Sequence, residues 1–165
     1  HSTMVFTTKK TQARELDLRG AKFTIKTVQA ERIFGGQNVW IENHKIIVSD
    51  PTRTIVDAFN DPAVVGGIRM AVDILGRYMK SDYKNTDLLF RYSKQMKNTA
   101  IFKRLGFVFE RLHPEEKAFI EKIKKEIKSG YSQLDPTTPG KSLVTGWRLW
   151  VPTSWKKGAG FSDQY

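Results

Sequence analysis

Hydrophobic and polar residues alternate along the first fifty residues, and the period of two is that of a β-strand. Phe23 and Ile25, for example, share one face of a segment whose other positions are mostly polar. The Asn43-His44 pair favours a tight hairpin turn, and the apolar run from Ile46 to Val48 indicates a buried central strand. The alternation predicts strands at residues 5–8, 22–28, 38–42 and 45–49.

From Asp50 onward the apolar residues recur every three or four positions, which is the period of an amphipathic helix. Asp50-Pro51 and Asp61-Pro62 each combine a capping carboxylate with a proline in the first turn. Asn85 and Asn98 can cap later helices in the same way. The pattern predicts five helices, one starting at Pro51 and the others at residues 62–79, 86–96, 99–112 and 114–130.

Several residues within these helices have a predicted structural role. Arg53 and Asp57 are spaced i,i+4, so we interpret them as an intrahelical ion pair rather than a proton-transfer dyad. Gly66 and Gly67 each cost about 1 kcal/mol in a helix relative to alanine. Close packing is therefore favoured for them over a phosphate-binding loop, because no Gly-Lys-Ser/Thr follows. Gly106 also indicates close backbone contact.

The end of the chain has another β-rich segment. Residues 147–151 predict a strand with Trp147 in the core, whereas Trp150 and Trp155 are compatible with core packing or with stacking on nucleobases. Residues 152–165 are polar and are expected to form a loose tail. The fold class is α+β, with a small mostly antiparallel sheet, built from the N-terminal strands and one C-terminal strand, packed with about five helices.

Net charge is the strongest compositional feature, because 28 Lys and Arg residues against 17 Asp and Glu give the chain a formal charge of +11. Such a domain favours phosphate polymers through counterion release. The chain has no cysteine, so disulfides and thiolate metal sites are excluded. No signal peptide or membrane-spanning run is evident, and a cytoplasmic location without cofactor or metal is expected.

The sequence does not predict an active site. The best candidate, Glu42 to Lys45 with Asp50 and Asp57 downstream, has a Glu-to-Lys spacing one residue too long for a metal-dependent nuclease. Alternation along a strand would send these two side chains to opposite faces. His113 is interpreted as a turn residue, and the protein is expected not to be an enzyme.

Basic residues give the better functional candidates. If the helices that carry them pack side by side, their outward faces would join into one positive surface for backbone phosphates. A solvated helix face is the alternative for each helix taken separately. The candidate nucleic-acid-binding residues are Lys94, Lys97, Lys103, Arg104, Lys124, Lys125 and Lys128.

A series of short motifs resembles the C-terminal domain of AbiEi-type antitoxins. The most specific is the string Asp-Pro-Thr-Arg-Thr followed by two hydrophobic residues and an aspartate, with a Gly-Gly pair downstream. The residues of this string and of the glycine pair are expected to be structural: Asp50, Pro51, Arg53, Thr54, Asp57, Gly66 and Gly67. Weaker matches are Arg32–Gly35, Asp61-Pro62, Lys103–Phe107 with Glu110, Leu134–Pro136 and Trp147–Leu149.

The resemblance covers about residues 5–151, and residues 1–4 are interpreted as the remnant of an expression tag. It implies an antitoxin of a bacterial type IV toxin–antitoxin (abortive infection) system that acts as a transcriptional autoregulator. The implied partners are operator DNA with inverted repeats and a nucleotidyltransferase-like toxin antagonised without a stable complex. RNA is a further candidate partner of the basic domain. An N-terminal winged helix-turn-helix, expected in the full-length protein, would read most of the operator and is absent from this sequence.

Two alternatives from other classes stay open. A nuclease-like metal-dependent enzyme, active or degenerate, would need carboxylates converging beside a lysine on the sheet. A protein-interaction module would instead present an exposed apolar patch of several hundred Å².

Overall fold

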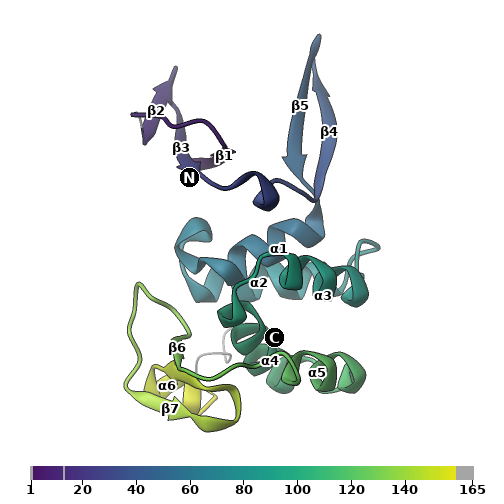
Figure 1. The fold of residues 1–165 in the computed structure, drawn as a ribbon, viewed down its shortest axis with the longest axis vertical. Coiled ribbons are helices and arrows are strands. Elements are labelled where there is room, and N and C mark those ends of the chain that lie inside the picture. The colour runs from purple at the N-terminus through teal and green to yellow at the C-terminus, as the bar shows by residue number, and fades with distance from the viewer. Residues whose placement is uncertain (1, 13, 159–165) are drawn as a thin grey trace. The chain divides into compact units, whose positions relative to one another are not determined.

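A computed structural model describes residues 2–12 and 14–158 and has an α+β fold (Figure 1). The chain divides into two compact units, one ending at Val48 and the other beginning at Ser49. The division falls inside the single domain expected over residues 5–151. The period-two segment at the start of the sequence forms the first unit, and the second unit contains the helices together with the C-terminal strands. Among the described residues, no helix is both long and apolar enough to cross a membrane.

The first unit contains a three-stranded sheet of β1 (Ser2–Thr7), β2 (Glu15–Leu18) and β3 (Ala21–Thr27) in the order β1-β3-β2. β1 runs parallel to β3, with Val5 opposite Ile25, and β2 runs antiparallel to β3. β2 was not predicted, because all four of its side chains are exposed and only half are apolar. Ser2 to Met4, interpreted from the sequence as tag, belong to β1.

The same unit contains the turn η1 (Ala30–Arg32) and a hairpin of β4 (Gly36–Ile41) and β5 (His44–Ser49). The hairpin turn lies at Glu42-Asn43, one residue earlier than predicted, and Glu42 has a left-handed φ of 53°. The prediction that Ile46 to Val48 form a buried central strand is wrong. Ile47, for instance, is 72% exposed, because β4 and β5 form a sheet of only two strands.

The second unit is mainly helical, and Figure 1 shows it from teal to yellow. α1 packs on α2, α3 and α4, and α4 also packs on α5. Every residue of α4 from Ile101 to Phe109 is buried, so this helix is the centre of the core. The helices are α1 (Pro51–Asn60), α2 (Ile68–Met79), α3 (Thr86–Gln95), α4 (Thr99–Leu112), α5 (Lys117–Lys124) and α6 (Thr153–Lys156).

Three predicted helix caps are confirmed. Asp50 Oδ1 accepts a 2.7 Å hydrogen bond from the Arg53 N–H at the start of α1. Asn85 caps α3 and Asn98 caps α4 through their side-chain oxygens. Each carboxylate or amide satisfies a backbone donor that has no partner inside its own helix. These starts depend on contacts over two or three residues, which explains why the sequence predicts them.

Two predicted helices have different bounds in the structure. The helix expected over 62–79 is interrupted, because Gly66 (φ 95°) and Gly67 (φ 109°) separate the 3-10 turn η2 (Pro62–Val65) from α2. The side chain of Asp61 makes no capping hydrogen bond at η2. The helix expected over 114–130 is shorter, since α5 ends at Lys124.

The C-terminal strands form a third small sheet in the order β6-β8-β7. β6 (Ser132–Gln133) runs parallel to β8 (Leu149–Val151), and β7 (Ser142–Val144) runs antiparallel to it. In residues 2–12 and 14–158 the strands thus form three separate sheets rather than the single sheet expected, although the α+β class is confirmed.

The strand expected over 147–151 begins only at Leu149, and Trp147 lies in the preceding 3-10 turn η3 (Thr145–Trp147). It is nevertheless a core residue, as predicted. After β8 the chain forms α6, in which Trp155 is only 3% exposed. The prediction of a loose tail is therefore wrong for residues 152–158. Residues 159–165 of that tail lie outside the described residues.

Candidate nucleic-acid interface

Two of the predicted phosphate-binding residues, Lys103 and Arg104, are buried inside the second unit. Lys103 is 2% exposed, and its Nζ donates to the carbonyl of Gly130 at 2.9 Å. Arg104 is 4% exposed. The prediction that they belong to an outward basic face is wrong for both. The reason is that α4 is the central helix, so the two cations are covered by elements distant in sequence.

Arg104 has a structural function that the sequence did not reveal. Its Nη1 donates to the carbonyls of Phe59 and Asn60 at 2.9 Å, and its Nε donates to that of Gln133 at 3.0 Å. Phe59 and Asn60 are the last residues of α1, where carbonyls lack helical partners and a cation is favourable. Burial lowers the pKa of Arg104, although Asp135 and Asp61 oppose this change.

Lys94 lies on the surface, but its charge is matched. Its Nζ is 3.0 Å from Glu126 Oε1, and Lys122 Nζ is 2.9 Å from Asp87 Oδ1, so two ion pairs join α3 to the region of α5. Both ammonium groups also lie over the ring of Phe90, at 5.7 and 4.5 Å. The face between α3 and α5 therefore carries mixed charge, which reduces its attraction for phosphate.

The other four candidates, Lys97, Lys124, Lys125 and Lys128, are exposed. Lys97 follows α3 with a left-handed φ of 54°, whereas the other three lie at the end of α5 and just after it. Lys124 Nζ lies 5.4 Å from the ring of Trp147. Within the described part of the chain, none of the four forms an ion pair. They are the predicted cations that remain available to solvent.

In a group of aromatic and basic residues near β6 and β8, only Trp150 was considered from the sequence, and Tyr131 and Arg148 were missed. The Arg148 guanidinium lies 6.0 Å from the ring of Tyr131, and the Tyr131 and Trp150 rings are 6.2 Å apart. Tyr131 is 53% exposed. The interleaving of basic and aromatic residues from Trp147 to Trp150 was a signal that could have indicated this group, since nucleic-acid-binding surfaces combine these residue types.

The family-motif residues at the start of the second unit stabilise α1. Arg53 Nε donates to both carboxylate oxygens of Asp57 at 3.0 Å, which confirms the predicted ion pair. Both residues are buried. Burial raises the pKa of Asp57, while the charge and hydrogen bonds of Arg53 act against the shift. Thr54 Oγ1 donates to the carbonyl of Asp50 at 3.0 Å.

The glycine pair lies at the start of α2. Asp135 Oδ2 accepts a 2.8 Å hydrogen bond from the Ile68 N–H, and a Cβ on Gly67 would lie only 3.1 Å from the same oxygen. Burial alone would raise the pKa of Asp135, but hydrogen bonds from Thr137 and Ile68 lower it overall. A carboxylate thus occupies the place a phosphate would take. The close-packing interpretation is confirmed for Gly67 but is wrong for Gly66, where a Cβ would meet nothing within 4 Å and the left-handed φ of 95° is the reason for glycine.

The residues considered for catalysis lie on separate elements of the two units. Glu42 lies in the hairpin turn, and Lys45 lies on β5. In residues 2–12 and 14–158, no group of three or more His, Asp or Glu side chains is arranged to hold a metal. His113 ends α4, where its Nδ1 lies 3.3 Å from Glu115 Oε1, in keeping with a turn residue.

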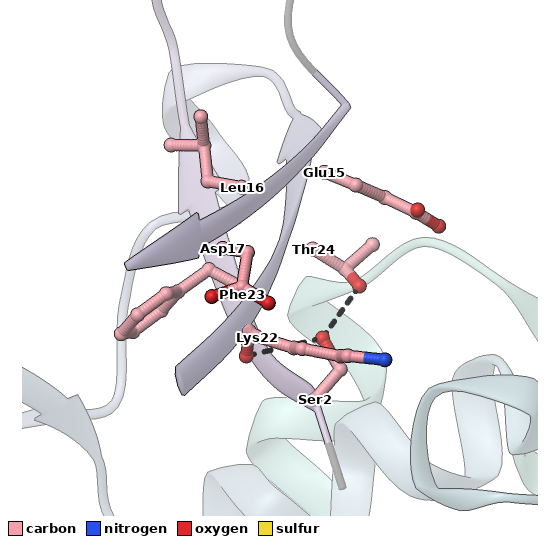
Figure 2. A pocket seen from close by; sticks show the side chains of 7 residues that line it. All are labelled: Ser2, Glu15, Leu16, Asp17, Lys22, Phe23 and Thr24. Carbon is pink, nitrogen blue, oxygen red and sulfur yellow. Dashed lines mark hydrogen bonds between the residues drawn. The ribbon is translucent and has the colours of Figure 1, made fainter. Parts of the chain in front are cut away.

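The first unit has a pocket of about 430 Å³ on its three-stranded sheet (Figure 2). In it, Ser2 Oγ lies 2.8 Å from Thr24 Oγ1 and donates to the Lys22 carbonyl at 3.3 Å. Asp17 stands opposite Lys22 in the register. The arrangement is that of a cross-strand charge pair on an exposed sheet, and it does not bring a nucleophile and a base together. The other residues around the pocket are Glu15, Leu16 and Phe23.

Comparison of the chain with protein-family models, curated proteins and solved structures finds no match. Interpretation of the site therefore depends on its residues and their geometry.

Proposed function

We propose that this chain is a non-enzymatic regulatory domain of the AbiEi antitoxin type, and that it contacts nucleic acid through exposed basic residues of its second unit. The observation that carries the proposal is the set of exposed lysines at the end of α5, namely Lys124, Lys125 and Lys128. With a chain charge of +11, they favour a polyanionic partner.

The roles of the motif residues also support a regulatory domain. Asp50 caps α1, Arg53 pairs with Asp57, and Gly67 accommodates the carboxylate that caps α2. The charged residues of the motif are thus used in maintaining the fold. This is the pattern expected of a binding domain whose motif defines its architecture, with function residing in the surface.

The binding part of the proposal is tested with the full chain, fluorescently labelled duplex DNA and labelled RNA, each at several salt concentrations. We expect affinity to fall steeply with salt, and the triple variant Lys124→Glu, Lys125→Glu, Lys128→Glu to bind more weakly. Its salt dependence should be shallower by roughly one unit of log–log slope for each phosphate that the variant no longer neutralises.

The matched control reverses Lys9, Lys10 and Lys45 to Glu, three exposed lysines of the first unit. It changes the net charge by the same amount, so an equal loss of affinity in both triple variants would argue against a localised surface. Absence of wild-type binding even at low salt would refute the nucleic-acid role.

The antitoxin part is tested by co-expression of the chain with the product of the neighbouring gene while growth is followed. Protection of the host by the wild-type chain is expected. Failure to protect would contradict the antitoxin assignment, and it would leave the binding result unaffected.

A further inference from the structure

Tyr131, Arg148 and Trp150, with the ammonium group of Lys103 nearby, form what we term the aromatic–cation patch. All four residues belong to the second unit. Nothing in the structural account of α1, α2 or α4 requires Tyr131 or Arg148. Their arrangement therefore needs a separate explanation.

The parallel pairing of β6 with β8 creates this patch. The Ser132 N–H donates to the Arg148 carbonyl at 3.1 Å, and the Leu134 N–H donates to that of Trp150 at 2.9 Å. This register places Tyr131, the residue before β6, beside Arg148. Alternation along β8 directs Leu149 and Val151 into the core and leaves Trp150 partly exposed.

The aromatic members offer stacking surface to solvent. Tyr131 is 53% exposed, and its ring is tilted by 51° to that of Trp150, with 6.2 Å between the centroids. With about half of its surface exposed, the Tyr131 side chain is accessible to a planar ligand. Nucleobases stack on such rings with little dependence on sequence.

The basic members supply a positive field beside the rings. Arg148 is exposed, and its guanidinium lies 6.0 Å from the Tyr131 ring. Lys103 is nearly buried, and its Nζ donates to the carbonyl of Gly130, the residue before Tyr131. Burial and the positive charge of Arg148 lower the pKa of Lys103. Neither forms an ion pair in the part of the chain that the structure describes. Two adjacent cations without a carboxylate favour an anionic ligand.

The backbone at Arg148 has a left-handed conformation that is less favourable for arginine than for glycine. Arg148 ends η3 with φ 50° and ψ 46°, the left-handed conformation in which helix-ending glycines are preferred. Strained conformations of this kind cluster at binding sites, where a side chain is needed in spite of the strain. Glycine would suit the fold better here, so the arginine side chain is the feature to be explained.

We propose that the aromatic–cation patch binds single-stranded nucleic acid, with bases stacked on Tyr131 and Trp150 and a phosphate bound by Arg148. Lys103 strengthens the field without touching the ligand, because it is only 2% exposed. Single strands are the expected ligand, because the bases of a duplex are stacked on one another and their faces cannot contact Tyr131 or Trp150. The inference rests on the proposed nucleic-acid function and makes it more specific.

The test measures binding of the full chain to labelled single-stranded DNA, single-stranded RNA and duplex DNA. Each probe is about ten nucleotides or base pairs long, which is within the site size of a single-strand-binding domain. For Tyr131→Ala we expect the single-strand Kd to rise about five-fold or more, which corresponds to losing one stacked base. Duplex binding should be unchanged, and Tyr131→Phe should retain single-strand affinity. The DNA and RNA arms show which sugar is preferred.

Arg148→Gly separates binding from folding. This variant should unfold at the same or a higher urea concentration than the wild type, yet bind single strands more weakly. Its matched control is Arg19→Gly, which removes one positive charge from another left-handed position, in the β2–β3 turn. The control should keep wild-type affinity for single strands.

Tryptophan fluorescence reports stacking directly. Trp147 and Trp155 are buried and Trp40 is 67% exposed, so a Trp40→Phe background leaves Trp150 as the tryptophan that solvent ligands can reach. Single strands should quench its emission, and Tyr131→Ala should reduce the quenching.

Three results would overturn the inference: unchanged single-strand affinity in Tyr131→Ala, equal losses of affinity in Arg148→Gly and Arg19→Gly, or a wild-type preference for duplex. Each of these leaves general nucleic-acid binding intact. If the wild type binds neither single strands nor duplex at low salt, the proposed nucleic-acid function fails as well.

Discussion

Replacement of Gly106 by alanine tests the packing at the centre of the second unit. Gly106 lies in the middle of α4, and a Cβ built there would overlap three ring carbons of Trp147. That ring is 1% exposed, and its Nε1 donates to Glu110 Oε2 at 2.7 Å. Because the indole is held on one side by this hydrogen bond and enclosed elsewhere, a small shift cannot make room for the methyl group.

Two effects of opposite sign determine the expected magnitude. Alanine should stabilise the interior of a helix by about 1 kcal/mol relative to glycine. Displacement of a buried tryptophan approaches the cost of deleting it, about 3–5 kcal/mol. The clash therefore exceeds the propensity gain, and Gly106→Ala should lower the free energy of unfolding by about 2–4 kcal/mol.

Urea denaturation followed by far-UV circular dichroism measures this change, and near-UV dichroism reports displacement of the indole. The matched control is Gly146→Ala, because a Cβ at Gly146 meets nothing within 4 Å. It should change stability by less than about 0.5 kcal/mol. A Gly106→Ala variant as stable as the wild type would refute the reasoning.

Two further predictions concern charged groups of the core. Arg104→Met should lower the free energy of unfolding by about 3–5 kcal/mol, because three carbonyls lose a charged donor. Urea denaturation measures this change, with the exposed Arg91→Met as the control. Equal effects in both variants would contradict the role assigned to Arg104. The pKa of Asp135 is lower in the folded protein than in the unfolded chain, where it is about 3.9. The carboxylate therefore stabilises the fold at pH values above the unfolded pKa, and this stability is lost as the pH falls through the folded pKa. Urea midpoints measured against pH should therefore fall more steeply on acidification for the wild type than for Asp135→Asn, and parallel curves would exclude this contribution. Asp57, whose pKa is raised, acts in the opposite direction in both proteins and cancels in the comparison.

Features that depend on a few neighbouring residues were predicted from the sequence. The Asp50 cap and the Arg53–Asp57 pair are formed within one turn of α1. The α+β class followed from the change of hydrophobic period near residue 50, where the structure also divides into two units. Gly106 was expected to make close backbone contact, although the sequence did not identify Trp147 as its neighbour.

Features that depend on distant pairings could not be predicted in this way. Lys103 and Arg104 were expected on an outward face because a basic residue in a helical pattern is normally solvated. Their actual surroundings come from the ends of α1 and β6 and from Gly130, which lie many residues away. The failed prediction of a central strand at Ile46 to Val48 has a related cause, since apolar character alone does not show which strands will pair.

The sequence by itself determined the helix starts, the helix-forming and strand-forming halves and the excess of positive charge, because capping, periodicity and composition act locally or over the whole chain. Only the tertiary structure decided which cations are buried and which stay at the surface. It also joined Asp135 to the start of α2 and brought Tyr131 beside Arg148. The physical reason is that burial and ion pairing depend on contacts between residues far apart in the chain, and these contacts form only when the helices and strands pack.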